Sequence, residues 1–318
     1  MLDPFVTSDE GKRIVNYLCT KFLIGTLAKT MATPFEMAKM IKQDQFIKKS
    51  LFVKAGKKRD DKGYADLSTY GILLKLYDDR GLAGLFVGNT ANVMRFWPTQ
   101  LLNFHLKDYI KAMFPKVDKT TAPGKAFLVN VLSGGAAGAA SLLAAYPIDM
   151  VRCKMITSTP EDPISKSKTF GEAMARIILE NPEQGLLSLY SGYGISIAGI
   201  IPFRGMYFGV QRFLARHNPF RENSGLIGVL SKSLTAQVAA VSAATSTYPF
   251  DTIRRGQQEY PGKSAWEVLQ EVLNAGGWSA LFYGAGANAM RTVMSAMILV
   301  IQGEVKHAFE RQTKPASG

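Results

Sequence analysis

Three copies of one short motif place a carboxylate and a base three residues apart, just after a proline. The copies read TPFEMAK at 33–39, YPIDMVR at 146–152 and YPFDTIR at 248–254. Residues three apart share one face of a helix, so each copy presents an acid and a base together. Groups of this type form ion pairs. The six charged residues are Glu36, Lys39, Asp149, Arg152, Asp251 and Arg254.

The six charges can pair in two ways. They can neutralise each other within each helix, or they can form a ring in which each acid meets the base of another helix. A charge at membrane depth costs a few kcal/mol unless it is paired or faces a cavity. Three-fold repetition favours the ring, with pairs Glu36–Arg152, Asp149–Arg254 and Asp251–Lys39. The prolines of the motifs, which kink helices and would bring their ends together, are Pro34, Pro147 and Pro249.

A second set of cations stands in apolar sequence with no acid nearby. One interpretation gives some of them structural partners, such as backbone carbonyls or lipid phosphates, and Arg204 fits this interpretation best. A cluster of unpaired cations at membrane mid-depth is better explained by an anionic ligand in a water-filled cavity. Arginine suits this purpose because its guanidinium binds phosphate oxygens in pairs. The set consists of Lys29, Arg95, Arg204, Arg255 and Arg291.

Long uncharged runs indicate the elements that carry these residues. Residues 126–148, 184–203 and 233–250 hold no charge, and a membrane-spanning helix needs about 20 apolar residues. Interrupted apolar stretches lie around 22–35, 96–106 and 292–303. Buried helices of a soluble protein are the alternative. Small residues such as those at 133–142 oppose it, because they let helices pack closely in lipid.

The repeat extends beyond the motif. Each copy is followed by a polar, basic stretch and then a short amphipathic segment, which ends in a glycine after an aromatic residue: LFVGN at 85–89, LYSGY at 189–193 and LFYGA at 281–285. A second apolar helix follows. The pattern predicts an all-α membrane protein with six transmembrane helices in three pseudo-threefold repeats plus short helices. The repeats are expected at 1–120, 121–222 and 223–318.

The amino-acid composition restricts the classes of binding partner. The 318 residues include 38 Lys and Arg against 25 Asp and Glu, a formal charge of +13. This favours an anionic partner: nucleic acid, an acidic lipid surface or an anionic small molecule. The uncharged runs argue against a soluble nucleic-acid binder. Two cysteines exclude a disulfide scaffold, and with three histidines they predict no metal site. The first 13 residues lack an apolar core and carry acids, so we expect neither a signal peptide nor a presequence.

Longer stretches resemble the mitochondrial carrier family, and within it the carriers of ADP and ATP. These stretches are GNTANVMRFWPTQLLNFHLKD at 88–108, SGGAAGAASL at 133–142, SGYGISIAGIIPFRGMYFGV at 191–210 and TYPFDTIRR at 247–255. The resemblance covers about residues 12–310. It implies one six-helix barrel in the mitochondrial inner membrane that exchanges ADP and ATP by alternating access. It also implies no catalytic residue, no cofactor and a structural lipid, cardiolipin.

The resemblance transfers a substrate site and a gate onto this chain. Lys29, Arg95 and Arg291 would contact the phosphates. Residues on the fourth helix would lie against the purine, and a few others fall on further lining positions. The motif ring would be the matrix-side gate. The remaining substrate-site residues are Asn103, Gly199, Ile200, Phe203, Tyr207, Thr247 and Arg255.

Three departures from the family pattern stand out. The nucleotide carriers have three arginines and then three methionines after the third acid, whereas residues 254–259 here read RRGQQE. Phe203 replaces a tyrosine. The intermembrane-side gate, which should have an acid and a base on each even-numbered helix, keeps only the pair Asp108 and Lys306. Its other positions hold Lys111, Arg212, Ala215 and Gly303, and the three lipid-binding motifs lack their base, with Val87, Ser191 and Tyr283 in its place.

These departures leave a second function open. The chain could be a carrier-derived structural subunit that has lost transport and packs with other inner-membrane proteins. The eroded upper gate favours this hypothesis, and the retained substrate positions oppose it. From the altered upper gate we expect a resting state that is open to the intermembrane side and held by an intact lower ring, with slow or absent turnover.

Overall fold

The computed structural model describes residues 9–55, 67–115, 122–158, 162–167, 169–220 and 226–294. Within these ranges the chain forms helices and turns and no strand, so the predicted all-α fold is confirmed. The elements are α2 (Asp9–Ala55), α3 (Thr69–Gly84), α4 (Asn89–Ala112), α5 (Pro123–Thr157), η1 (Pro163–Lys166), α6 (Phe170–Glu180), η2 (Gly185–Tyr190), α7 (Tyr193–His217), α8 (Leu226–Ser246), α9 (Tyr248–Glu259) and α10 (Ala265–Ala280).

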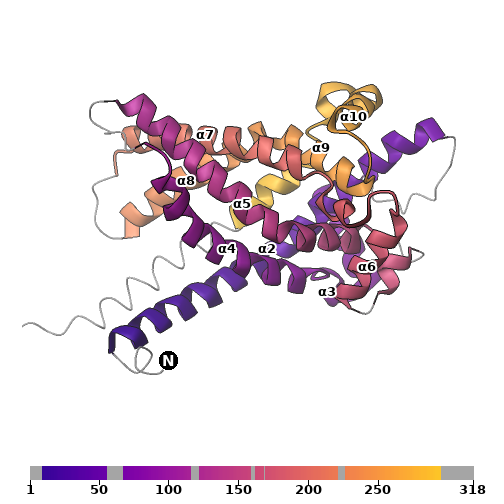
Figure 1. The fold of residues 1–318 in the computed structure, drawn as a ribbon, viewed down its shortest axis with the longest axis horizontal. Coiled ribbons are helices and arrows are strands. Elements are labelled where there is room, and N and C mark those ends of the chain that lie inside the picture. Colours follow the sequence, from indigo (N-terminus) through magenta and orange to yellow (C-terminus); the bar gives the residue numbers. More distant parts are fainter. Residues whose placement is uncertain are drawn as a thin grey trace, which may run out of the picture.

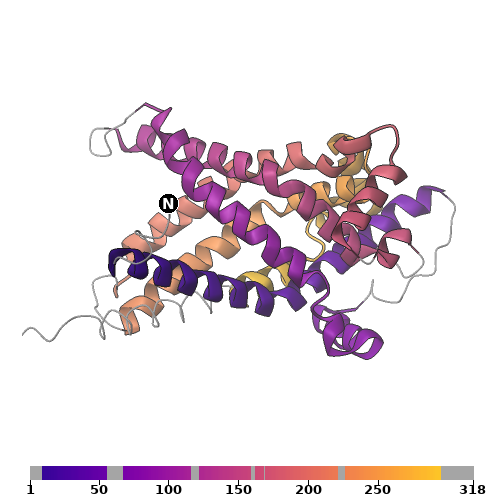
Figure 2. The ribbon, with the colours of Figure 1, turned by 60° about the horizontal axis from the view of Figure 1, so that its bottom comes forward.

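The order long helix, short helix, long helix occurs three times. Repeat 1 contains α2, α3 and α4, and repeat 2 contains α5, α6 and α7. In repeat 3, α8 and α9 make up the first long segment and α10 follows, after which residues 285–294 are helical. The long helices run together along the molecule, and α3, α6 and α10 gather at one end (Figures 1 and 2). By length and composition, two segments of the described chain could each cross a membrane: 124–157 and 185–217.

The three motif prolines have different effects on their helices. Pro34 lies inside α2 and Pro147 inside α5, and both helices continue through them. In repeat 3 the helix is interrupted at Thr247, which is not helical, and Pro249 stands in the first turn of α9. Proline is well tolerated there because the first turn of a helix leaves its N–H groups without intrahelical partners. The expected kink is therefore a full break in the third repeat.

The short helices begin in the same way in each repeat. Their first residues follow Ser68, Thr169 and Ser264, whose side-chain oxygens accept hydrogen bonds from backbone N–H groups at 3.1, 3.2 and 3.2 Å. In α10 the Glu267 carboxylate accepts a hydrogen bond from Ser264 N in return, and this bond lowers the pKa of Glu267. Each short helix then packs an apolar face on the long helices, α3 and α10 also against a neighbouring repeat. The buried residues of these faces are Ile72, Leu76, Ala173, Ile177, Val268 and Val272.

The repeated glycine after the aromatic residue is required by its backbone conformation. Gly88 and Gly192 are the N-caps of α4 and α7 with φ of 76° and 84°, and Gly284 precedes the helix at 285–294 with φ of 91°. Residues with a side chain rarely adopt such angles. The three glycines therefore mark equivalent turns between each short helix and the long helix that follows it.

Two of these turns are also held by a tyrosine from the motif. Tyr146 donates its hydroxyl hydrogen to Ser191 O at 2.8 Å, and Tyr248 donates to Tyr283 O at 3.1 Å. A Cβ on Gly192 would lie 2.9 Å from the Tyr146 hydroxyl oxygen. Tyr146 inside α5 and Tyr248 at the start of α9 thus tie each motif helix to the turn that precedes the next long helix of the same repeat.

Candidate functional site

The acids and bases of the three motifs meet between α2, α5 and α9. Lys39 Nζ lies 2.6 Å from Asp251 Oδ2, and Arg152 Nη2 lies 2.8 Å from Glu36 Oε2. The Arg254 guanidinium pairs with the Asp149 carboxylate. These are the three inter-helix pairs that the sequence predicted. Within a helix, Arg254 Nη1 also lies 4.0 Å from Asp251 Oδ1.

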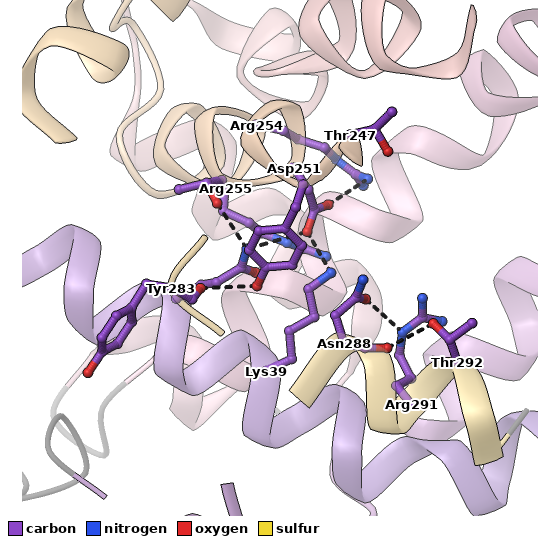
Figure 3. A network of polar contacts seen from close by, with 12 residues as sticks. Lys39, Thr247, Asp251, Arg254, Arg255, Tyr283, Asn288, Arg291 and Thr292 are labelled. Atoms are coloured by element: carbon purple, nitrogen blue, oxygen red, sulfur yellow. Dashed lines mark hydrogen bonds and ion pairs between the residues drawn. The ribbon is translucent and has the colours of Figure 1, made fainter. Parts of the chain in front are cut away.

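The ring is closed tightly. Arg152 is 0% exposed and Asp149 is 1% exposed, although both carry a full charge. Buried charges are tolerated only when they are paired and their remaining hydrogen-bonding groups are satisfied. Figure 3 shows part of this network, with Lys39 and Arg254 reaching Asp251 from different helices. At this level the path between the three helices is blocked by side chains.

Several residues that sequence reasoning missed complete the ring. Asn92 donates to Glu36 Oε2 at 3.1 Å, and Gln43 lies 3.4 Å from both Asp251 Oδ2 and Thr252 Oγ1. Gln43 follows Lys39 by four residues, so its position on the same helix face was a usable signal. Asn92 comes from α4 and follows Gly88 by four residues, as Asn288 follows Gly284, so the repeat around these glycines was a usable signal.

Two motif bases also lie over aromatic rings. The Lys39 ammonium is 5.2 Å from the Tyr248 ring centroid, and the Arg254 guanidinium carbon is 5.4 Å from the Tyr146 ring centroid. A cation over an aromatic face is attracted by the ring's negative charge density, more strongly when water is excluded. The motif tyrosines therefore stabilise the ring as well as the turns described above.

Arg95 was expected to have no acidic partner, but in the structure it forms an ion pair. Its Nη1 lies 3.0 Å from Asp149 Oδ1, while Arg254 binds the other oxygen of the same carboxylate. The sequence could not show this contact because Asp149 is on α5 and Arg95 is on α4. Asp149 is thus shared between a ring base and a cation expected to bind substrate.

A cavity of about 550 Å³ lies against the ring, between α4, α5, α7 and α9. Asp251 and Arg254 of the ring line it together with mostly apolar residues, so the cavity borders the ring. Phe203 and Tyr207 lie parallel on its wall, with ring centroids 6.4 Å apart and planes 7° apart. The residues predicted for the substrate site that line this cavity are Gly199, Ile200, Phe203, Tyr207 and Thr247.

Arg204 also lines the cavity. The sequence had favoured a structural role for it, paired with backbone carbonyls or lipid phosphates. Its guanidinium lies beside two glycines of α5: a Cβ on Gly134 would be 2.7 Å from Arg204 Nη1, and one on Gly138 would be 3.0 Å from Nη2. Among the described residues, no acid is paired with Arg204. The glycine-rich stretch of α5 therefore makes room for a cation as well as for close helix packing.

The other predicted phosphate contacts, Lys29 and Arg291, lie outside this cavity. The Lys29 ammonium is 5.5 Å from the Phe96 ring centroid, and Arg291 Nε donates to Asn288 Oδ1 at 3.2 Å (Figure 3). None of Lys29, Arg95 and Arg291 lines the aromatic cavity.

Arg255 is not brought to the cavity. Its Nη1 donates to Gln258 Oε1 at 2.9 Å, one turn further along α9. The structure describes Asn103 and Asp108 as part of α4 but does not describe their side chains, and Lys306 lies outside the described residues. Arg212 is exposed, with its guanidinium carbon 4.9 Å from the Phe127 ring centroid. The upper gate therefore stays a prediction.

Gly256, which stands where nucleotide carriers have their third arginine, is in close contact with α10. A Cβ on Gly256 would lie 2.3 Å from Val268 Cγ1, and Val268 is fully buried. No side chain fits at position 256 unless α10 moves. The loss of the third arginine is thus part of how α9 and α10 pack.

We expect Gly256→Ala to lower the free energy of unfolding by about 1–3 kcal/mol, the usual effect of overpacking a core. The thermal midpoint of the purified protein measures this. Gly171→Ala is the matched control, because Gly171 is helical and its Cβ would meet nothing within 4 Å. Equal midpoints for the two variants would contradict the prediction.

Comparisons with known proteins agree with the repeat. The family model described as "Mitochondrial carrier protein" matches residues 10–118, 124–219 and 227–313. The chain is 32% identical over 315 residues to the ADP,ATP carrier protein of Parachlorella kessleri, covering 95% of this chain and 89% of the relative. It is 34% identical over 310 residues to ADP,ATP carrier protein 1, mitochondrial, of Triticum aestivum, covering 93% and 89%. It is 31% identical over 299 residues to ADP/ATP translocase 3 of Bos taurus, covering 90% and 95%.

Proposed function

Because the chain belongs to the mitochondrial carrier family, whose members are inner-membrane transporters and not enzymes, we propose that it exchanges ADP and ATP by alternating access across the mitochondrial inner membrane. The observation that carries this proposal is the aromatic cavity that borders the ring of ion pairs. In an alternating-access cycle, ion pairs beside a substrate cavity would hold one side of it closed and part to open that side.

The chemistry of the wall suits an adenine nucleotide. Phe203 and Tyr207 offer parallel rings for a purine, and Gly199 and Ile200 line the same cavity. Lys29, Arg95 and Arg291 supply positive charge for the phosphates. Phe203 retains a ring but lacks the hydroxyl of a tyrosine, so stacking on it needs no hydrogen bond. We expect the binding to weaken with added salt, but less than at an exposed site.

The test is nucleotide exchange by the purified full-length protein in liposomes. We expect uptake of labelled ATP into vesicles that contain ADP, saturation with external ATP, and little uptake into vesicles without internal nucleotide. Inorganic phosphate inside the vesicles is the control for a different anion exchanger. Uptake that depends on internal phosphate and ignores internal ADP would contradict the proposal.

A second candidate function is a structural subunit of a larger inner-membrane assembly, held by other proteins and by lipid such as cardiolipin. The residues at the upper gate positions favour it: Arg212 is exposed and lies against Phe127, with no partner acid among the described residues. A folded protein that binds no nucleotide in the liposome assay would support this alternative.

The altered upper gate leads to a prediction for the rate of nucleotide exchange. Exchange requires both closed states to be accessible, since a ligand only shifts an equilibrium between states that the protein can reach. We expect Arg212→Asp, Ala215→Lys and Gly303→Asp combined to make exchange faster than in the native protein, because the three changes restore opposite charges. Fast exchange by the native protein, unaltered in the triple variant, would show that closure does not need these charges.

A further inference from the structure

Beyond the ring, at its matrix end, α5 and α9 share another ion pair. Lys154 Nζ lies 3.4 Å from Glu259 Oε2 and donates to the Glu259 backbone oxygen at 2.7 Å. Thr157 Oγ1 lies 3.4 Å from the same carboxylate oxygen. The Lys154 and Glu259 side chains are only 14% and 13% exposed, so this pair is largely shielded from water.

A buried glutamine lies next to Glu259 in the sequence and contacts residues beside the ring. Gln258 is 0% exposed, and its Nε2 donates to the Tyr146 hydroxyl oxygen at 3.3 Å while its Oε1 accepts from Arg255 at 2.9 Å. Tyr146 in turn lies under the ring base Arg254. Both polar atoms of Gln258 are therefore satisfied, one of them by repeat 2.

Gln257, which precedes Gln258, adds one more link between repeats 2 and 3. The Ser191 hydroxyl, in the turn before α7, donates to the Gln257 backbone oxygen at 2.7 Å. The contacts of Lys154, Thr157, Tyr146 and Ser191 all join repeat 2 to the last turn of α9. They involve positions 257–259, where this chain carries Gln, Gln and Glu.

We infer that Lys154, Gln258 and Glu259 form a second closure layer, which holds the matrix side shut in addition to the ring. The inference rests on the proposed transport cycle, in which α5 and α9 must separate for the matrix side to open. In the closed state Lys154 pairs with Glu259, and Gln258 hydrogen-bonds to Tyr146 and Arg255, in each case largely away from water. In the open state water would replace the contacts that join α5 to α9. The layer therefore stabilises only the closed state and shifts the equilibrium toward it.

The thiol of Cys153 offers a native reporter of this opening. It precedes Lys154 on α5, is 3% exposed and packs with buried residues of α2 and α3, including Met37 and Ile72. A thiol reagent reaches it only when these helices separate. With Cys19→Ser as background, labelling by N-ethylmaleimide of the full-length protein in liposomes reports on a single site.

We expect Glu259→Gln to increase the rate of Cys153 labelling about tenfold, because the carboxamide keeps the shape and loses the charge. The exchanged pair, Lys154→Glu with Glu259→Lys, is expected to restore slow labelling. The matched control is Glu183→Gln, which removes an exposed acid from the turn before η2 and should leave the rate unchanged.

An unchanged labelling rate in Glu259→Gln would overturn the inference. A second result would also overturn it: fast labelling and a lower thermal midpoint in both Glu259→Gln and the exchanged pair. That result would mean that the contacts serve general stability. Labelling needs no nucleotide. A failure of nucleotide exchange with the expected labelling pattern would therefore contradict the proposed substrate and leave the second closure layer supported.

Discussion

Replacing Asp149 with asparagine is expected to destabilise the protein more than any other single change in the ring. Asp149 binds Arg95 through one oxygen and Arg254 through the other, and its side chain is 2% exposed. The amide has no charge with which to balance two guanidinium groups in a buried position. Removing one partner of a buried ion pair costs about 3–5 kcal/mol, because the remaining charge stays buried without compensation.

Thermal unfolding of the purified protein in detergent measures this effect. Each kcal/mol lowers the midpoint by roughly 2–4 °C in proteins of about 150–250 residues, so a loss of many degrees is expected. Asp78→Asn, on the exposed face of α3, is the matched control and should leave the midpoint nearly unchanged. The double variant Asp149→Asn with Arg254→Gln should recover part of the loss. A midpoint for Asp149→Asn equal to that of the control would refute the prediction.

Replacing Arg291 with alanine is expected to weaken the binding of ATP and ADP by about 10–100-fold. Hydrogen bonds to charged groups contribute about 1.5–3 kcal/mol each, and tenfold in affinity corresponds to 1.4 kcal/mol. Arg291→Lys should lose less, because it keeps the charge but not the paired geometry of a guanidinium. Calorimetric titration of the purified protein with each nucleotide gives the affinities.

The interpretation of this experiment depends on two further variants. Arg95→Ala should also weaken nucleotide binding, but it additionally removes a partner of Asp149, so its thermal midpoint must be measured beside its affinity. Arg216→Ala removes an exposed cation in the last turn of α7 and controls for the general loss of positive charge. If Arg95→Ala and Arg291→Ala both leave ATP and ADP binding unchanged, the proposed phosphate contacts are wrong.

The ring could be predicted from the sequence because its members repeat. A charge pattern that occurs three times on equivalent helices restricts the possible partners to the same helix or another motif helix, and burial of the charges favours the latter. The pairs Glu36–Arg152 and Lys39–Asp251 follow from this reasoning. Asn92 and Arg95 belong to α4 and recur in repeat 3 as Asn288 and Arg291, but their partners Glu36 and Asp149 lie on other helices. Their contacts depend on how α4 packs against α2 and α5, which periodicity does not reveal.

The helices could be predicted from the uncharged runs and from the repeat. The places where a helix is continuous or broken could not. Pro249 stands after Thr247 at a break between two helices, while Pro34 and Pro147 lie inside continuous ones. The three motifs are too similar in sequence to distinguish a break from a kink. The position of Arg204 depended on the empty space beside Gly134 and Gly138, and such space is known only when two helices are placed against each other.

The contact between Gly256 and Val268 restricts the order in which substitutions can accumulate. A side chain at position 256 and the valine methyl group at position 268 require the same volume. An ancestor with an arginine at 256 must therefore have had either a smaller residue at 268 or a displaced α10. With valine at 268, an arginine at 256 would require Val268 or α10 to move. At this position a return to the nucleotide-carrier signature would therefore be easier with a second change at 268.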